Sequence, residues 1–276
     1  MKKFFLALSL AIFCLVSNAQ LKIPAASPSQ TVKQDFGLSS IELSYSRPGM
    51  KGRTVFGDLV PFDKVWRTGA NNATTLSFGD EVTIGGKKIP AGKYGLLSIP
   101  GKTSWTLIIT KQTNVTSPAA YKQEEDMVRL TAKPTNLPAS VETFTIGFHD
   151  VTPASCKVKI AWDKTAVSFS ITTDVDSKVM ASIDQAMMGE KPPYFQAAFY
   201  YLDNNKDLKK ANEWFAKAVE ATPNAFWVRY QQAKGLAKAG KKAEAREAAT
   251  KSKELAIEAK NDDYVKLNDK LLAELK

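Results

Sequence analysis

The sequence predicts an all-β antiparallel sandwich followed by an all-α domain of helical hairpins. Two observations predict this order. Between Ile41 and Ile171, apolar side chains recur at every second position, the period of a strand with one buried face. Beyond Asp174 they recur every three or four positions, which is typical of an amphipathic helix. With 276 residues, the chain is long enough for two packed domains.

The first residues have the layout of a secretory signal peptide. Met1-Lys2-Lys3 supplies positive charge, residues 4–16 form an apolar run of 13 residues, and small residues precede Gln20. A helix needs about 20 apolar residues to span a bilayer core of roughly 30 Å, so this run is too short to be a membrane anchor. We expect cleavage after Ala19, which makes residues 1–19 a signal peptide, and a mature chain that is periplasmic or secreted.

Short strands are expected over residues 20–173, the predicted β-sandwich domain. Gly85-Gly86 supplies the positive φ angles of a tight hairpin, and Pro100-Gly101 marks another turn. Many short strands without a long helix favour an antiparallel sandwich. The alternating runs that predict strands lie at residues 41–45, 76–78, 82–84, 94–97, 105–109, 144–148, 158–162 and 167–171.

A helix is predicted to link the two domains over residues 174–190. Its apolar residues step by four, which places them on one helical stripe, and Gly189 ends the pattern. The stripe residues are Val175, Val179, Ile183 and Met187.

Residues 191–276 contain a repeat of 34 residues. Ala211 maps to Ala245, and Gly240 lies where a turn between helices is expected. This spacing resembles the tetratricopeptide repeat, a helix–turn–helix unit of 34 residues. The other matched pairs are Phe199 with Ala233, Leu202 with Leu236, Phe215 with Ala249, and Ala218 with Ser252. Residues 262–275 are predicted to form a capping helix. Two repeats and a cap are few for an independent solenoid, so we expect this domain to dock onto the sandwich.

Charge and rare residue types argue against several functions. The net charge is +10, but the basic excess is spread along the chain, which argues against a nucleic-acid binder. His149 is the single histidine, and Cys156 is the single cysteine after the signal peptide, so we predict no metal site, cofactor or catalytic residue. Stable membrane insertion is not expected either. The run Glu124-Glu125-Asp126 is interpreted as a solvated face.

One segment, between residues 46 and 71, has the pattern of neither a strand nor a short turn. Within 21 positions it places the four cations Arg47, Lys51, Arg53 and Arg67, and its glycines let backbone N–H groups approach a ligand closely. The planar fork of Arg suits carboxylate or phosphate oxygens, and an indole offers a flat apolar face. The candidate ligand-binding residues are Arg47, Lys51, Arg53, Trp66, Arg67, Thr68 and Asn71.

This segment also carries a family resemblance. The run YSRPGMKGRTVFGDLVPFDKVWRTGANNATTLSF, followed by IPAGKYGLLSIPG and WTLIITK, resembles the bacterial family called domain of unknown function 2911 over roughly residues 27–172. The resemblance implies an exported β domain, often with a helical-repeat tail, and implies no activity. After Lys111 the family tends to carry a Trp-Gly pair, where this chain has Asn114-Val115-Thr116. A site that uses that tryptophan is therefore not carried over.

Two interpretations of the arginines remain open. In the first, the segment forms a pocket for an anion or a glycan with Arg47, Trp66, Arg67 and Asn71. In the second, the arginines fasten a long loop over an open end of the sandwich by pairing with carboxylates nearby in sequence. Those carboxylates are Glu42, Asp58 and Asp63.

For the whole chain we expect an exported, non-enzymatic binding or assembly protein that contacts a protein partner through its helical repeats. The candidate partner-binding residues lie in the first helix of each hairpin and are Gln196, Tyr200, Trp227 and Tyr230. The same aromatic residues could instead pack a junction between the domains. The alternative function is a binder of a small anionic ligand or glycan, or a hydrolase, that uses the segment in the β domain.

Overall fold

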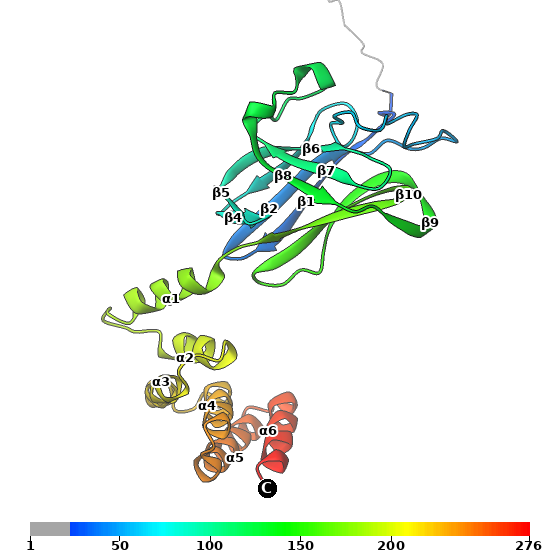
Figure 1. The fold of residues 1–276 in the computed structure, drawn as a ribbon. Helices are drawn as coiled ribbons and strands as arrows, with labels where there is room; N and C mark the ends of the chain where they lie inside the picture. Colours follow the sequence, from blue (N-terminus) through cyan, green and yellow to red (C-terminus); the bar gives the residue numbers. More distant parts are fainter. Residues whose placement is uncertain (1–22) are drawn as a thin grey trace, which may run out of the picture. The chain divides into compact units, whose positions relative to one another are not determined.

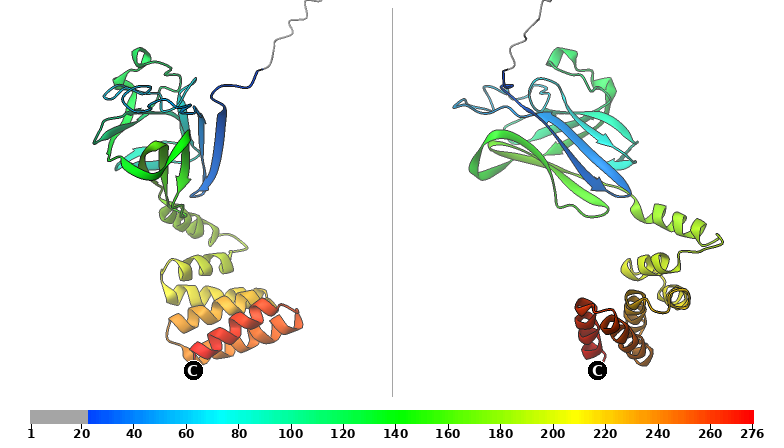
Figure 2. Two further views of the ribbon diagram at one scale, coloured as in Figure 1. Left: turned by 90° about the vertical axis from the view of Figure 1, so that its right-hand side faces the viewer. Right: turned by 180° about the vertical axis from the view of Figure 1, so that it is seen from behind.

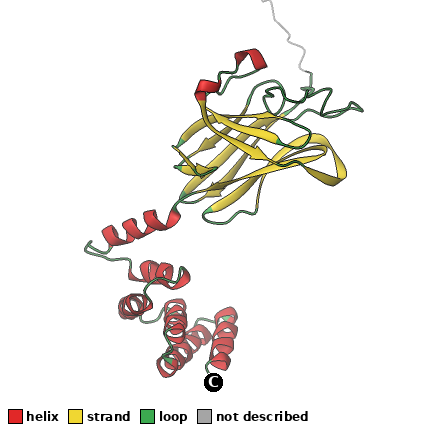
Figure 3. Cartoon of the chain, viewed as in Figure 1, coloured by secondary structure: helices red, strands yellow, loops and turns green. Residues whose placement is uncertain are grey.

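The computed structural model describes residues 23–276, so the predicted signal peptide lies outside the described residues. The chain divides into two compact units, with the boundary between Asp174 and Val175. The first is built mainly from strands and the second from α-helices (Figure 3). The predicted fold class, an antiparallel β domain followed by an α domain, is confirmed.

Two antiparallel sheets form the first unit (Figure 1). Its described residues hold the strands β1 (Ser29–Phe36), β2 (Ser39–Ser46), β3 (Thr74–Phe78), β4 (Val82–Ile84), β5 (Lys87–Ile89), β6 (Gly92–Ile99), β7 (Trp105–Thr110), β8 (Asp126–Ala132), β9 (Thr135–His149) and β10 (Ser155–Thr172). The larger sheet has the order β1-β2-β3-β6-β7-β8, and the smaller has the order β5-β4-β10-β9. The core lies between them and takes apolar side chains from both.

The pairing register places alternating side chains in this core. Leu43 of β2 lies opposite Leu76 of β3, and both side chains are fully buried. Phe144 of β9 and Ile160 of β10 enter the same core from the smaller sheet. Full burial of one such side chain contributes roughly 1.5–3 kcal/mol to stability. The positive φ angles expected at Gly85-Gly86 are present in the hairpin between β4 and β5.

A bulge at Asp163 joins two alternating runs into one strand. Before Asp163 the buried side chains stand at even-numbered positions such as Trp162, and from Val167 to the end of the strand they stand at odd-numbered positions. The register of β10 with β9 shifts on both sides of Asp163, whose φ is 50°. Across these shifts β9 advances four and then five positions against two and two of β10, and such a break in the ladder lets the side chains that follow turn to the opposite face. The strands predicted at 158–162 and 167–171 are therefore the two halves of β10.

Two edge strands of the larger sheet, β1 and β8, were missed by the sequence analysis. In β1 the burial alternates only between exposed and half-buried residues until Phe36. Asp126 begins β8, and its side chain is only 5% exposed. The interpretation of Asp126 as part of a solvated face is therefore wrong, because Tyr121 and Arg129 both donate hydrogen bonds to its carboxylate.

The second unit is a series of helices, and from the second helix to the sixth each packs on the next (Figure 2). Its helices are α1 (Val175–Ala186), α2 (Tyr194–Asp203), α3 (Leu208–Ala221), α4 (Phe226–Lys238), α5 (Lys242–Glu258) and α6 (Asp262–Glu274). Fully buried alanines such as Ala211, Ala245 and Ala249 allow close approach of neighbouring helices. Between residues 23 and 276, no helix combines the length and apolar character needed to cross a bilayer.

The predicted linker helix is α1, and it packs as part of the helical unit. Ile183 is buried in a cluster that includes Ala197 and Tyr201 of α2. At the start of α1, Asp176 accepts hydrogen bonds from Lys206 Nζ (2.6 Å) and from the hydroxyl of Tyr200 (2.8 Å). Both bonds lower the pKa of Asp176, and the bond from Lys206 has the larger effect. The helix is thus held by an apolar face and by a polar anchor.

Candidate functional site

A long loop, residues 47–73, joins β2 to β3 and covers one end of the sandwich (Figure 1). Ser44 lies opposite Thr75 in antiparallel neighbours, so the loop leaves and re-enters the larger sheet at the same end. It pairs with Thr143 of β9 through Gly49, and with Ser98 of β6 through Trp66. The loop is therefore fastened to both sheets.

Arg47 ties the start of this loop to β9. Its Nε donates to the carbonyl oxygen of Phe144 (3.2 Å), and its Nη2 donates to Oγ1 of Thr145 (3.0 Å). Beside it, the Tyr45 hydroxyl donates to the carbonyl oxygen of Ile146 and accepts from its N–H, both at 3.0 Å. Arg47 therefore closes a seam between the two sheets.

Arg53 and Arg67 also donate to backbone carbonyl groups. Arg53 donates through Nε to Met50 (2.9 Å) and through Nη2 to Gly49 (2.8 Å). Arg67 donates through Nη1 to Thr116. Within residues 23–276 the arginines form none of the predicted pairs with Glu42, Asp58 or Asp63. The carboxylate pairing is therefore wrong. Backbone carbonyl groups fasten these arginines, with Thr145 as a further partner of Arg47, and among residues 23–276 none of the three forms an ion pair.

The indole of Trp66 joins an aromatic cluster. Its ring lies 5.2 Å from that of Phe144 at 67°, and 6.0 Å from that of Trp162 at 17°. Phe56 and Trp105 complete the cluster, with centroids 5.0 Å apart. Edge-to-face pairs contribute about 0.5–1.5 kcal/mol each beyond their burial. Trp66 is only half-buried, so part of its ring remains accessible.

Thr68 fixes the turn that follows Trp66. It is fully buried, with φ at 54°, a left-handed conformation that β-branched residues rarely adopt. Its hydroxyl lies 2.8 Å from the Ser98 hydroxyl, and its carbonyl accepts from Oγ1 of Thr74 (2.6 Å). Trp66 Nε1 donates to the carbonyl of Gly69 (3.0 Å) across the same turn. Such strain clusters at functional sites.

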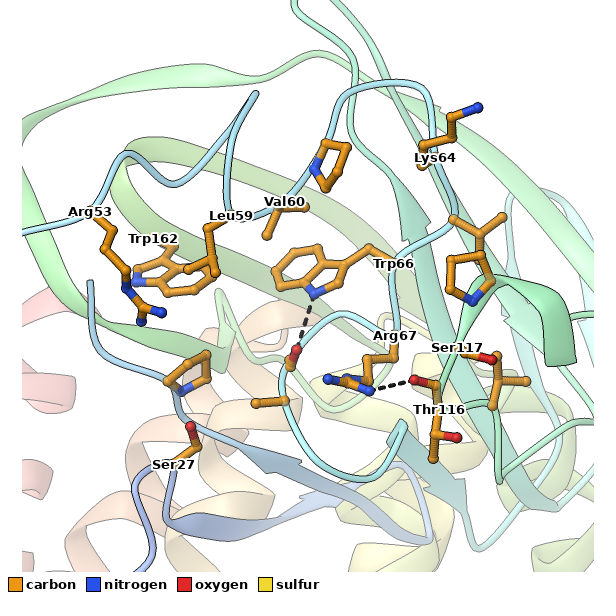
Figure 4. Close-up of a pocket in the computed structure, with 17 residues that line it drawn as sticks. Ser27, Arg53, Leu59, Val60, Lys64, Trp66, Arg67, Thr116, Ser117 and Trp162 are labelled. Atoms are coloured by element: carbon orange, nitrogen blue, oxygen red, sulfur yellow. Dashed lines mark hydrogen bonds between the residues drawn. The ribbon is translucent and has the colours of Figure 1, made fainter. Parts of the chain in front are cut away.

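A pocket of about 510 Å³ lies between this loop and residues 115–118 (Figure 4). Its volume is in the range of small-molecule sites. Three cationic side chains line it, those of Arg53, Lys64 and Arg67, and none of its described lining residues is Asp or Glu. The other lining residues are Ser27, Pro48, Leu59, Val60, Pro61, Val65, Trp66, Gly69, Ala70, Val115, Thr116, Ser117, Pro118 and Trp162.

The second wall of the pocket comes from residues 111–125, which join β7 to β8. Val115 is buried against Leu97 and Ile108 on the outer face of the larger sheet. The Thr116 carbonyl accepts the bond from Arg67, so the two loops are tied together. Val115 and Thr116 therefore help to shape the pocket.

A hydrogen-bonded cluster anchors the end of this second wall. Asp126 Oδ2 accepts from the Tyr121 hydroxyl (2.5 Å) and from Arg129 Nη1 (2.9 Å). Arg129 Nη1 also donates to the Tyr121 oxygen (2.6 Å). Burial and the bond to Asp126 raise the pKa of Tyr121 to about 12.

The structure brings three of the seven candidate ligand-binding residues to the pocket: Arg53, Trp66 and Arg67. The other four, Arg47, Lys51, Thr68 and Asn71, do not line it. Asn71 instead donates from Nδ2 to the carbonyl of Ser27 (3.1 Å). Sequence reasoning missed Lys64, although it lies two positions before Trp66. It also missed Trp162, because the alternating pattern marks Trp162 only as a core residue of a strand and does not show that it also lines a pocket.

A family comparison covers this region. The sequence model of the family described as "Protein of unknown function (DUF2911)" matches residues 27–171. The chain belongs to the DUF2911 family. The DUF2911 match contains every residue that lines the pocket, and the six helices of the second unit lie outside it. Neither the curated proteins nor the solved structures give a match.

The candidate partner-binding residues of the helical unit have different environments. Gln196 is exposed and Trp227 is 44% exposed, with its ring edge-to-face with that of Phe226. Tyr200 donates to Asp176. Tyr230 packs edge-to-face on Tyr264 at 5.6 Å, and burial raises its pKa. Of these four residues, Gln196 and Trp227 are therefore exposed, and Tyr200 and Tyr230 are half-buried.

Proposed function

We propose that this DUF2911 protein is an exported, non-enzymatic binding protein that holds a small anionic ligand in the pocket of its β unit. One observation carries the proposal: Arg53, Lys64 and Arg67 line one pocket, and no described carboxylate lines it with them. A cleft lined by charge of one sign attracts ligands of the opposite sign.

The surroundings of these cations strengthen their effect. Trp66 and Trp162 form part of the wall, together with apolar side chains such as Leu59 and Val60, and a ligand bound against them displaces water from the cations. Charge-assisted hydrogen bonds gain strength where water is excluded. The hydroxyl residues of the wall, Ser27, Thr116 and Ser117, have neither a histidine nor a carboxylate beside them in the lining to act as a base. This composition supports binding rather than hydrolysis.

Export is supported by the N-terminal sequence. The basic start, the apolar run of 13 residues and the small residues before Gln20 form the three parts of a signal peptide. The proposal places the mature protein in the periplasm or outside the cell. Edman sequencing or mass spectrometry of the protein from the envelope fraction tests it, with a start at Gln20 as the expected result.

Thermal unfolding with a ligand panel tests the binding function. At constant ionic strength, a small organic anion is expected to raise the Tm of the mature chain by several degrees, because a ligand that binds only the folded state stabilises it. The rise should be lost in Lys64→Gln. A neutral oligosaccharide that raises Tm equally in both proteins would contradict anion binding and favour a glycan.

A second candidate function, partner binding by the helical unit, is favoured by the exposed aromatic ring of Trp227. A tetratricopeptide-like arrangement supports it. Residues 34 apart are buried in both copies at Ala211 and Ala245, and at Phe215 and Ala249. One predicted match differs, because Phe199 is 40% exposed, whereas Ala233 is fully buried.

A pull-down from envelope extract tests this second function. The variant Trp227→Ser is expected to lose a partner that the wild-type chain retains, since aromatic residues dominate binding energy at protein interfaces. Ile257→Ser is the matched control, because Ile257 of α5 is also exposed (56%) but lies outside the candidate surface. Retention of every partner by a chain that lacks residues 191–276 would rule the helical surface out.

A further inference from the structure

The pocket combines an apolar wall with cations that have no ionic partner. Leu59, Val60, Val65 and Val115 line it together with the indoles. Within residues 23–276, no carboxylate pairs with its cationic side chains. We propose that the ligand is an amphiphilic anion: a carboxylate, or a similar oxyanion, attached to a flat apolar ring. This inference rests on the proposed anion-binding function and names its ligand class.

The aromatic residues define where the ring would lie. Trp66 and Trp162 are nearly parallel, with an interplanar angle of 17° and centroids 6.0 Å apart. Leu59, which is 38% exposed, lies next to Trp162 in the same wall (Figure 4). Trp162 is only 2% exposed, so the accessible aromatic surface is that of the half-buried Trp66. Together with the exposed aliphatic side chain of Leu59 it favours an aromatic or fused ring, since such apolar surfaces gain from leaving water.

The arginines define where the anionic group would lie. Figure 4 shows Arg67 beside Trp66, and Arg53 beside Trp162. Arg67 uses Nη1 for the Thr116 carbonyl, and Arg53 uses Nε and Nη2 for its two carbonyls. The guanidinium has five N–H donors, so each side chain keeps donors for an oxyanion. A planar carboxylate matches this donor geometry.

A neutral sugar fits the wall less well. Saccharide hydroxyls both donate and accept, and sugar sites normally offer carboxylate or amide side chains as acceptors. Among the described lining residues there is no Asp, Glu, Asn or Gln. The side chains of Arg53, Lys64 and Arg67 only donate. The pocket is therefore rich in donors, poor in side-chain acceptors and apolar elsewhere.

Isothermal titration calorimetry on the mature full-length chain tests the ligand class with three probes. The probes are 2-naphthoate, its neutral analogue 2-naphthamide, and acetate, which has the charge without the ring. We expect 2-naphthoate to bind, 2-naphthamide to bind at least about tenfold more weakly, and acetate to give no measurable heat.

Point variants assign the binding to this pocket. Lys64→Gln and Arg67→Gln should each weaken 2-naphthoate by about tenfold, and Leu59→Asn should weaken it through the ring. Lys64 is exposed and has no partner among residues 23–276, so Lys64→Gln gives an answer even if Arg67→Gln disturbs the two loops. Lys88→Gln removes the same charge from an exposed lysine paired with Glu81 and should leave affinity unchanged.

The outcomes separate this inference from the proposed function. In one outcome, acetate or a sugar acid such as glucuronate binds as tightly as 2-naphthoate, and Lys64→Gln weakens that binding. The chain then binds anions without needing the ring, and the inference is overturned. If none of these anions binds, the proposed function fails as well. Equal affinity for 2-naphthoate and 2-naphthamide would show that the cations are not used, and would overturn both.

Discussion

Thr68 holds the site residues Trp66 and Arg67 in place without touching the pocket. Its backbone has a left-handed conformation, and strain of this kind costs about 1–3 kcal/mol. The hydroxyl pair with Ser98 and the bond from Thr74 compensate for that strain in a fully buried setting. The polar contacts of Thr68 thus determine how the loop presents its neighbours.

We predict that Thr68→Val destabilises the protein by about 1–3 kcal/mol. The change keeps the shape but removes the hydroxyl, which leaves the fully buried Ser98 hydroxyl without this partner. Denaturant unfolding measures the difference. Thr131→Val, at an exposed position of β8, is the control and should change stability by less than about 0.5 kcal/mol. Equal effects in the two variants would show that the hydroxyl pair contributes nothing.

Tyr121 gives a prediction that depends on pH. In the folded chain its pKa is about 12, against 10.0 for the free side chain, so the folded state favours the protonated phenol. The stability that it contributes is complete below about pH 10 and is lost as the pH rises toward about 12. Below pH 10, Tyr121→Phe should cost about 1–2 kcal/mol, since it removes a hydrogen bond from the buried Asp126.

The measurement is the difference in unfolding free energy between wild type and Tyr121→Phe at about pH 8 and about pH 11. The difference should shrink at the higher pH, because only the wild type loses the contribution of this phenol. The other tyrosines titrate equally in both proteins and cancel. A difference that stays constant with pH would contradict the role assigned to the phenol.

At the scale of elements, the two loops of the pocket are held in different ways. Residues 47–73 are stitched to both sheets through backbone bridges and through the side chain of Arg47. Residues 111–125 are held by the buried side chain of Val115 and by the cluster around Asp126. The contact between Arg67 and Thr116 joins them. The cations of the pocket therefore lie on loops positioned by a rigid sandwich.

We predict that Arg47→Ala lowers stability by about 1–3 kcal/mol and leaves ligand affinity unchanged. Arg47 bonds Phe144 and Thr145 of β9 and does not line the pocket. Chemical denaturation and calorimetry of the same samples measure the two effects. Lys51→Ala is the control, because it removes a cation from the same loop and keeps the bond of Lys51 to β9, which its backbone N–H donates to Glu142. Loss of affinity without loss of stability in Arg47→Ala would reverse the assignment.

How far the sequence determines these elements differs from place to place. Strands with one apolar face, such as β2, follow directly from alternation. The bulge at Asp163 could not be predicted, because the change of parity also fits two separate strands. The edge strand β1 lacks a buried face and gives no apolar signal.

The candidate site was predictable only in part. The cluster of cations and Trp66 marked the correct loop, and Arg53, Trp66 and Arg67 do line the pocket. Arg47 was indistinguishable from them in sequence, because its role depends on the distant partners Phe144 and Thr145. The wall at residues 115–118 joins the site only through tertiary packing, so no local pattern could indicate it.

At the scale of the whole molecule, the pocket and the helical unit are separate in sequence. The residues that line the pocket lie between Ser27 and Trp162, within the first compact unit. The family match covers the same span and ends at residue 171. The helices have their own buried clusters, built from α1 to α3 and from α4 to α6. Each unit therefore has the core that an independently folding domain needs.

We predict that residues 23–174, produced alone, fold and bind the ligand of the pocket with the affinity of the full chain. Far-ultraviolet circular dichroism should show a sheet-rich fragment with a cooperative thermal transition, because the complete sandwich core is retained. Calorimetry with 2-naphthoate then compares fragment and full chain, and residues 175–276 serve as a helical control without the pocket. A folded fragment whose affinity falls by more than about tenfold would show that the helices contribute to the site, since that change corresponds to about 1.4 kcal/mol.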